Sequence, residues 1–317
     1  MAQPRTVVIV NPNSQGGKLG KRWPVLAETL QRAFPFDDVH TTGPGHATQL
    51  VQAALRGGAE RIVAIGGDGT VNEVVNGFFE NGVAIAPQAS FALIPFGTGG
   101  DFRRSIEMPV DAPGAAAVIA AGHTRTIDLG KLELTALDGD GSRVIRMFAN
   151  IASFGVSGVV DRLVNQSGKK LGRMSFMLAT ARATWAYKNQ RVQLIFDGDV
   201  KHRVEATINT VAVANGKYFG GAMKIAPNAE LDDGLFDVVA MGDLGFGDLL
   251  KSGARIYKGT HLTMDKVSER RARVVEAEPI EPGALVELDV DGEPLGKLPA
   301  RFEIVPAALR IVVPGGR

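Results

Sequence analysis

The sequence contains no cysteine. This absence excludes disulfide bonds, thiolate metal sites and a cysteine nucleophile, and it fits a reducing compartment. The chain also has no apolar run of the roughly 20 residues that a membrane-spanning helix needs, and its amino terminus shows no signal peptide. We therefore expect a cytoplasmic protein, either free or peripheral at the inner face of the membrane.

An excess of either charge is absent as well. Lys and Arg number 35 and Asp and Glu number 34, which gives a net charge of +1. Nucleic-acid binders usually carry a strong basic excess, so nucleic acid is not an expected partner. The five histidines lack metal-ligand spacing, which argues against a histidine zinc site. A hydrophobic fraction of 45% over 317 residues favours a globular protein of two domains.

Strand-like and helix-like segments alternate over the first part of the chain, and we expect an α/β domain over residues 1–128. The strand-like segments are 6–10, 39–41, 61–65 and 90–95, and helix-like segments lie near 23–34, over 47–55 and after residue 70. This pattern predicts a doubly wound, mostly parallel sheet. Because ligands of such sheets bind at the carboxyl ends of the strands, the polar loops that follow the strands should share one rim.

The remainder, residues 129–317, is richer in strands and predicts a mainly antiparallel β-sandwich, whose last strand could return to the first domain. Helical stretches are expected near 174–189 and 246–257. The predicted strands are 127–134, 144–151, 192–196, 205–213, 236–241, 267–275, 286–290 and 309–313.

The run Gly66-Gly67-Asp68-Gly69-Thr70 stands between a buried strand and an amphipathic helix. Glycines allow positive φ and let an anion approach main-chain N–H groups, while the first helical turn carries partial positive charge. The run therefore predicts a phosphate site. The alternative is a tight turn in which Asp68 caps the helix. The P-loop, the dinucleotide fingerprint and the protein-kinase motifs are all absent.

Taken in order, the motifs resemble the diacylglycerol kinase catalytic-domain family of bacterial lipid kinases, which is related to sphingosine and ceramide kinases. The resemblance covers nearly the whole chain. Its motifs are Asn11-Pro12 with 14–17, then 66–74, 95–98 leading to Asp101-Phe102, Asn215-Gly216 before Gly220-Gly221, 227–235 and 291–293. The resemblance implies an NAD kinase/diacylglycerol kinase-like fold and an ATP-dependent, Mg²⁺-dependent transfer of the γ-phosphoryl group to a lipid hydroxyl, such as that of diacylglycerol.

The resemblance also implies site residues. Glu293 would be the general base that accepts the hydroxyl proton, Asp291 would hold that carboxylate or the metal, and Asp68 would lie near the triphosphate and its magnesium. The alternative for Asp291-Gly292 is a hairpin turn. The nucleotide site would comprise Asn11, Thr41, Gly66, Gly67, Asp68, Gly69, Thr70, Val71, Asn72 and Thr98.

A second magnesium site is implied at Asp233, with the carbonyl groups of Glu230 and Leu235. The alternative is an ordinary solvated turn. One residue departs from the family, because Gly100 stands where Asn is usual and an amide that could contact nucleotide or acceptor is lost. The following Asp101 either caps a helix or binds the acceptor hydroxyl.

The segment 162–191 is basic and contains no acidic residue. Such a segment could dock on an anionic bilayer and line an acyl-chain path, or it could be a helix with one core face and one solvated face. Its cations are Arg162, Lys169, Lys170, Arg173, Arg182, Lys188 and Arg191, and its apolar members include Phe176, Met177, Leu178, Trp185 and Tyr187.

Two other functions stay open. An NAD kinase-like enzyme would share the glycine-aspartate run, although the segments 227–235 and 291–293 argue against it. The other alternative is a nucleotide-binding regulatory protein without catalysis. It is compatible with Gly100, which replaces the usual Asn of the family. The lipid acceptor is not identified by the sequence, and a homo-oligomer is compatible with it.

Overall fold

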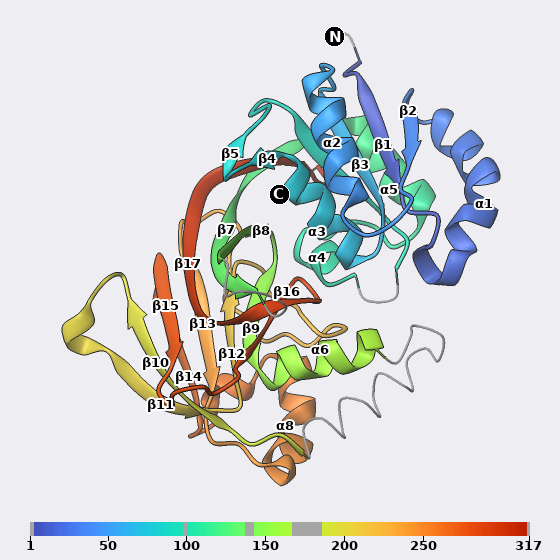
Figure 1. Ribbon diagram of the computed structural model, residues 1–317. Coiled ribbons are helices and arrows are strands. Elements are labelled where there is room, and N and C mark those ends of the chain that lie inside the picture. Colours follow the sequence, from blue (N-terminus) through green and yellow to red (C-terminus); the bar gives the residue numbers. More distant parts are fainter. Residues whose placement is uncertain (1–2, 98–99, 137–142, 167–185, 316–317) are drawn as a thin grey trace. The chain divides into compact units, whose positions relative to one another are not determined.

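The computed structural model describes residues 3–97, 100–136, 143–166 and 186–315 (Figure 1). These residues form two compact units. The first comprises the chain up to Leu129 together with the segment from Pro306 onwards, and the second is Gly130–Val305. Two strands run through both units, β7 (Thr124–Ala136) and β17 (Glu293–Val312).

The first unit is built on a parallel sheet. Its strands lie in the order β17-β6-β3-β1-β2, and every neighbouring pair is parallel. The bounds are β1 (Thr6–Val10), β2 (Asp37–His40), β3 (Arg61–Gly66) and β6 (Ser90–Pro95). The central strands β1 and β3 are buried throughout, as expected of strands covered by helices on both faces, whereas the edge strand β2 is mostly exposed.

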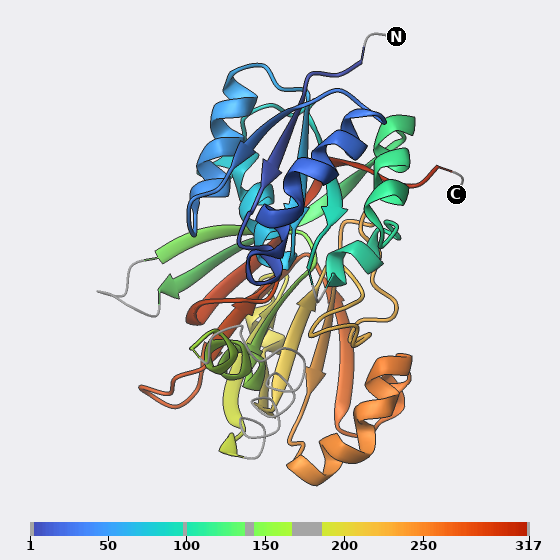
Figure 2. The same ribbon diagram turned by 90° about the vertical axis from the view of Figure 1, so that its right-hand side faces the viewer.

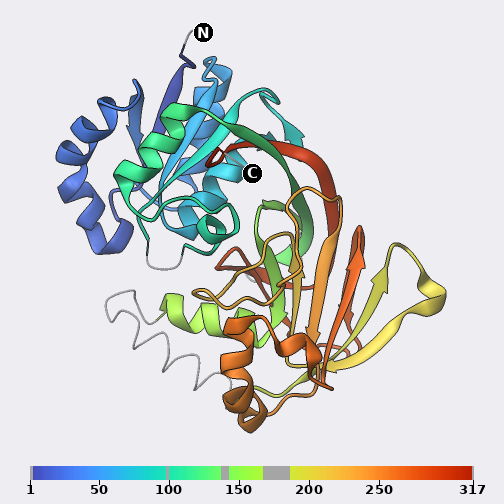
Figure 3. The same ribbon diagram turned by 180° about the vertical axis from the view of Figure 1, so that it is seen from behind.

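Helices cover both faces of this sheet. One face carries α2 (His46–Arg56) and α3 (Asp68–Gly77), and the other carries α1 (Ser14–Gln31) and α5 (Ala112–Ala121) (Figure 2; Figure 3). A Cβ atom at Gly77 would lie 2.5 Å from the Cβ of Val51, so this glycine allows α2 and α3 to pack closely. Short elements complete the unit: α4 (Asp101–Ser105), β4 (Phe79–Glu80) and β5 (Val83–Ala84). The predicted doubly wound sheet is confirmed.

The second unit is an antiparallel β-sandwich, which confirms the predicted architecture. Its strands follow the orders β14-β13-β12-β9-β16-β17 and β11-β10-β15-β17, and β8 pairs with β7. The core contains Phe148, Phe154, Phe236 and Phe302, of which Phe148 and Phe236 stack with ring centroids 5.6 Å apart. The bounds are β8 (Arg143–Phe148), β9 (Ile151–Gly155), β10 (Gln190–Phe196), β11 (Val204–Ile208), β12 (Thr210–Ala214), β13 (Phe236–Met241), β14 (Val267–Ala272), β15 (Val274–Pro279) and β16 (Glu287–Val290).

Helices and 3-10 turns connect these strands: α6 (Val156–Gln166), α8 (Phe246–Lys258), η2 (Val200–His202) and η3 (His261–Thr263). The helix expected near 246–257 is α8. The helix expected near 174–189 lies almost entirely outside the described residues, and α6 was not expected. Among the described residues, no helix has both the length and the apolar character needed to span a bilayer.

Three predicted strands are each divided in two, with breaks at 149–150, at Asn209 and at Arg273. At the last break, one carboxylate oxygen of Asp197 accepts hydrogen bonds from the amides of Arg273 (2.8 Å) and Val274 (2.9 Å). Those amides are therefore satisfied by a side chain where the chain passes from β14 to β15. The sequence around the break, Ala272-Arg273-Val274, contains no Gly, Pro or Asn that would mark a turn, which is why the sequence pattern did not reveal it.

Candidate functional site

The first glycine loop (residues 66–70) follows β3 and leads directly into α3, as the sequence predicts. However, neither Gly66 nor Gly67 has a positive φ, and Gly69 lies within the helix, so the loop does not use the left-handed conformation that glycine allows. A Cβ atom at Gly66 would lie 2.5 Å from the hydroxyl oxygen of Thr70, and one at Gly97 would lie 2.6 Å from the Cα of Gly67. These glycines therefore allow close packing within the loop and against the loop after β6.

Asp68 ties the first glycine loop to the second glycine loop (residues 96–101). Its Oδ2 accepts a hydrogen bond from the amide of Gly100 (2.8 Å), and its Oδ1 accepts one from the amide of Asp101 (3.2 Å). The N-cap of α3 is Gly67, so the alternative role of Asp68 as the cap of its own helix is wrong. The carboxylate is instead fixed at the start of α4, at the carboxyl edge of the sheet.

Of the other residues predicted to bind the nucleotide, some lie at this edge of the sheet and others are buried in the core. The side-chain amide of Asn11, just after β1, donates a hydrogen bond to the hydroxyl of Thr70 (3.0 Å). The amide of Thr41, just after β2, donates to the carbonyl of Val10 (2.9 Å). Val71 is 3% exposed and its amide is bonded to the carbonyl of Gly67, so its side chain is a core contact of α3.

Asn72, which follows Val71, is also buried, and its Oδ1 accepts a hydrogen bond from Asn76 (3.3 Å). Of the remaining predicted nucleotide residues, Thr98 lies outside the described residues.

The departure at Gly100 has a conformational explanation. Gly100 has φ +68° and ψ 41°, a left-handed conformation that glycine adopts freely and asparagine tolerates better than other residues. Gly and Asn are thus alternatives for one backbone requirement. A Cβ atom at this position would lie 3.5 Å from Nε of Arg103, which is ordinary contact.

Asp101 begins α4 and is buried, and its carboxylate pairs with Arg104 (3.2 Å). The same guanidinium donates a hydrogen bond to the carbonyl of Gly100 (3.0 Å). Burial is the main cause that lowers the pKa of the Arg103 guanidinium, and the charge of Arg104 lowers it further. The carboxylates of Asp101 and Asp68 act in the opposite direction. Neither arginine was predicted as a site residue, although their place directly after the second glycine loop was a usable signal.

Glu73 is a further residue that sequence reasoning missed. Its carboxylate accepts hydrogen bonds from the amides of Gly45 (2.9 Å) and Ala47 (3.1 Å) at the start of α2, and its carbonyl accepts one from the hydroxyl of Thr48 (2.8 Å). Glu73 therefore satisfies the first amides of α2 from a different helix. No local spacing could have revealed a cap that comes from so far along the chain.

In the second unit, Asp291 and Gly292 form the hairpin turn that the sequence offered as their alternative role, and this turn joins β16 to β17. Asp291 and Gly292 have φ +50° and +87°, the conformation of a two-residue hairpin turn. The Asp291 carboxylate accepts hydrogen bonds from three successive amides, those of Ala149 (3.2 Å), Asn150 (3.1 Å) and Ile151 (2.9 Å). It thereby holds the strand break between β8 and β9.

Glu293 follows this hairpin directly, half-buried at the start of β17 and opposite Val290. Asn215 lies at the same edge, because its side-chain amide donates a hydrogen bond to the carbonyl of Ala149 (2.9 Å). Asn150 in turn donates to the carbonyl of Tyr218 (2.6 Å). The hairpin and the segments 149–150 and 215–218 thus form one hydrogen-bonded cluster. Glu293 is the residue that directly follows this hairpin.

The turn 232–235 carries the predicted structural metal site. The Oδ1 of Asp233 accepts a hydrogen bond from the amide of Leu235 (3.1 Å), and Gly234 has φ +72°. In the described part of the chain, no cluster of three or more candidate metal-ligating side chains occurs. One carboxylate with the two carbonyl groups of Glu230 and Leu235 suits magnesium, which usually keeps several waters and binds one or two protein carboxylates.

Asp237 lies close to this turn and is 1% exposed. Burial, followed by the carboxylates of Glu269 and Glu230, raises its pKa to about 6. Its strand neighbour Arg271 lies within ion-pair distance, with Nε 3.8 Å from the Asp237 Oδ2. The same guanidinium pairs with Asp233.

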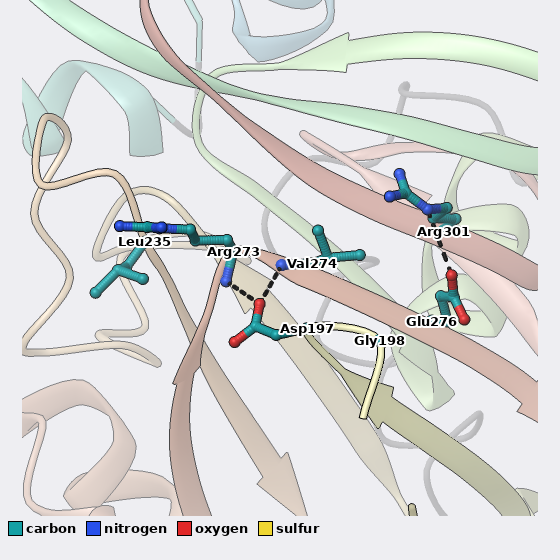
Figure 4. Close-up of a pocket in the computed structure, with 7 residues that line it drawn as sticks. All are labelled: Asp197, Gly198, Leu235, Arg273, Val274, Glu276 and Arg301. Atoms are coloured by element: carbon teal, nitrogen blue, oxygen red, sulfur yellow. Dashed lines mark hydrogen bonds and ion pairs between the residues drawn. The ribbon is translucent and has the colours of Figure 1, made fainter. Parts of the chain in front are cut away.

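A pocket of about 600 Å³ adjoins the turn 232–235 on the second unit (Figure 4). Among the predicted site residues only Leu235 lines it. Four of its seven lining residues are charged, including Arg301 and Glu276, which form an ion pair (3.4 Å). The lining residues are Asp197, Gly198, Leu235, Arg273, Val274, Glu276 and Arg301.

The basic segment 162–191 is described only at its ends. There Arg162 pairs with the buried Glu287 (2.7 Å), Arg191 pairs with Glu205 (3.6 Å), and Lys188 is exposed. Tyr187 packs against the apolar residues of α6. The remaining members of the segment lie outside the described residues: Lys169, Lys170, Arg173, Phe176, Met177, Leu178, Arg182 and Trp185.

Comparison with known proteins covers both units. The family model of the diacylglycerol kinase catalytic domain matches residues 5–132, and that of the YegS C-terminal NAD kinase beta sandwich-like domain matches residues 150–313. A diacylglycerol kinase of Mycobacterium tuberculosis is 30% identical over 98% of this chain and 95% of its own length. One from Staphylococcus carnosus is 30% identical over 94% and 91%, respectively.

Solved structures of similar fold include members of the same family. A diacylglycerol kinase from Bacillus anthracis has a TM-score of 0.73 at 26% identity, covering 98% of this chain and 97% of that one. Yeast NADH kinase has a TM-score of 0.56 at 12% identity, covering 99% and 84%, and this likeness shows the fold alone. The family matches, the relatives and the order of the motifs agree: the chain belongs to the diacylglycerol kinase family of lipid kinases.

Proposed function

We propose that this lipid kinase transfers the γ-phosphoryl group of ATP to a hydroxyl group of a lipid such as diacylglycerol, with Mg²⁺ as the metal. The observation that carries the proposal is the fixed position of Asp68. Its carboxylate is held by two amides of the second glycine loop, at the carboxyl edge of a parallel sheet and beside the first turn of α3. Ligands of doubly wound folds bind at this edge.

Unit 1 would bind the nucleotide through this rim. The proposed contacts are Asn11, Thr41, Thr98, residues 66–70 and the main chain at 71–72, with Asp68 as an oxygen ligand or an orienting group for the nucleotide-bound magnesium. When bound, ATP would supply the phosphoryl group and Mg²⁺ would neutralise charge that develops during its transfer. In the proposal, Asp101 binds the acceptor hydroxyl.

Glu293 is the proposed general base. The oxygen of the lipid hydroxyl forms a bond to the γ-phosphorus, the bond between that phosphorus and the β–γ bridging oxygen breaks, and ADP leaves. The hydroxyl proton passes to the Glu293 carboxylate. Asp291 is then a positioning residue, because its contacts with three amides fix the hairpin from which Glu293 projects.

Two further parts of the proposal concern the second unit. The turn 232–235 holds a structural magnesium ion through Asp233 and the carbonyl groups of Glu230 and Leu235. The basic segment 162–191 docks the enzyme on an anionic membrane surface, where each cation near the surface contributes about 1 kcal/mol.

The test is a screen of a total lipid extract with the purified protein and γ-labelled ATP, in which the phosphorylated product is identified by mass. The proposal predicts a labelled phospholipid that depends on Mg²⁺. NAD is offered as a competing acceptor in the same assay, and phosphorylation of NAD alone would favour the NAD kinase-like alternative. ATP binding without transfer to any acceptor would favour a regulatory protein.

A further inference from the structure

Arg271 lies on the edge strand β14, directly opposite Asp237 of β13 in the strand register. Its guanidinium contacts two carboxylates. One nitrogen, Nη2, pairs with Oδ2 of Asp233, and Nε lies 3.8 Å from Oδ2 of Asp237. A single cation of the chain therefore lies against both the proposed magnesium ligand and its buried neighbour.

Asp237 needs such a cation. It is 1% exposed, within the described residues neither of its oxygens has a hydrogen-bond partner of normal geometry, and the carboxylates of Glu269 and Glu230 nearby disfavour its charge further. A buried carboxylate without hydrogen bonds is costly unless a positive charge lies nearby. Arg271 places one such charge 3.8 Å away, and because its side chain is 48% exposed it reaches the carboxylates from the solvent side. Lys217 also acts on Asp237 and opposes the rise in its pKa.

The Asp233 carboxylate is also the proposed ligand of a metal ion. Under the proposed function its carboxylate binds magnesium together with the carbonyl groups of Glu230 and Leu235. Its Oδ1 already accepts the amide of Leu235 (3.1 Å), so the oxygen that faces Arg271 is the one more available to a metal. A divalent cation bound there would lie close to the guanidinium, and the two positive charges would repel each other.

We propose that Arg271 is a built-in competitor of the divalent cation at Asp233, neutralising Asp233 and Asp237 when the metal is absent and weakening metal binding when it is present. This inference rests on the proposed magnesium site and adds to it a residue that sets its affinity. The turn 232–235 then keeps its shape without metal, because the arginine and the amide of Leu235 both hold the carboxylate.

The experiment compares Arg271→Gln with Arg270→Gln. Arg270 precedes Arg271 on the same strand and stacks over the ring of Phe196 at 4.3 Å, so its loss removes an equal charge from a different place. Binding of Mg²⁺ and Mn²⁺ to the nucleotide-free protein is measured by isothermal titration calorimetry. The thermal midpoint is measured with and without each ion.

Arg271→Gln should bind the ions on the order of tenfold more tightly than wild type. This factor corresponds to the repulsion that Coulomb's law in water gives between a doubly charged ion and a unit charge about 5 Å away. Arg270→Gln should stay within about twofold of wild type, because its charge is farther away and screened. The rise in thermal midpoint on metal addition should be larger for Arg271→Gln than for Arg270→Gln.

Unchanged or weaker metal binding by Arg271→Gln would overturn the inference. Asp233→Asn separates this failure from that of the site itself: if it binds the ions as wild type does, no magnesium site exists at Asp233 and both proposals fall. Should Arg271→Gln not fold without metal, Arg271→Lys replaces it. Lysine retains the charge, so its affinity should remain near that of wild type, and a tenfold gain there would contradict charge competition.

Discussion

Replacing Asp291 with alanine should destabilise the second unit strongly. The substitution leaves three successive amides, at 149–151, without their acceptor. A hydrogen bond to a charged group contributes about 1.5–3 kcal/mol. Because the residue is 9% exposed and water can satisfy part of the lost interactions, we expect a loss of about 3–5 kcal/mol in the free energy of unfolding, a large part of a typical total of about 5–15 kcal/mol.

Two measurements test this expectation. Urea unfolding followed by far-UV circular dichroism gives the loss of stability, and hydrogen exchange with mass spectrometry reports the amides at 149–151 directly. Their exchange should accelerate in Asp291→Ala, while amides of β1 and β3 should exchange as in wild type. Asp291→Asn retains one acceptor oxygen and should lie between wild type and alanine. Equal stability and equal exchange in Asp291→Ala would refute the role assigned to the carboxylate.

Two further predictions concern conformation and pH. At Gly100, whose φ is +68°, Asn should be accepted with little loss of thermal stability, whereas Ala should cost about 1 kcal/mol; equal stability of the two variants would contradict the left-handed requirement. His261 is fully buried and its Nε2 contacts the carbonyl of Ile225 (2.9 Å). Burial lowers the pKa of its imidazole, so the unfolded chain takes up the proton first as pH falls below about 6.5, and stability is lost there. His261→Gln should lose less stability than wild type between pH 7.5 and 5.5 in urea titrations, and an identical loss would exclude this source.

The sequence predicted the architecture well, for reasons that are local. Largely apolar strands such as β1 and β3, alternating with amphipathic helices, are sufficient to indicate a doubly wound sheet. The Asp-Gly dipeptide at 291–292 indicated a hairpin as one of two alternatives, because few residues adopt two positive φ angles in succession. The ordered set of motifs gave the family, because it spans both units.

The roles within the site were harder to predict, because they depend on long-range contacts. Asp68 accepts amides 32 and 33 residues farther along, and Asp291 accepts amides more than 139 residues earlier. Glu73 caps a helix that precedes its own. Residue type and spacing identify such carboxylates as important, but their partners are set by the folded chain.

The glycines of the first loop illustrate the same limit. Their number suggested positive φ, whereas Gly66 and Gly67 serve close contacts that no sequence pattern specifies.

The central claim is that the Glu293 carboxylate accepts the proton of a lipid hydroxyl during phosphoryl transfer from ATP. The most direct test measures, for wild type and Glu293→Gln, the turnover of lipid phosphorylation with γ-labelled ATP and the equilibrium dissociation constant for ATP. The account predicts a loss of about 10²–10⁴-fold in kcat, with ATP affinity within about threefold of wild type. Turnover of Glu293→Gln at the wild-type rate would contradict it.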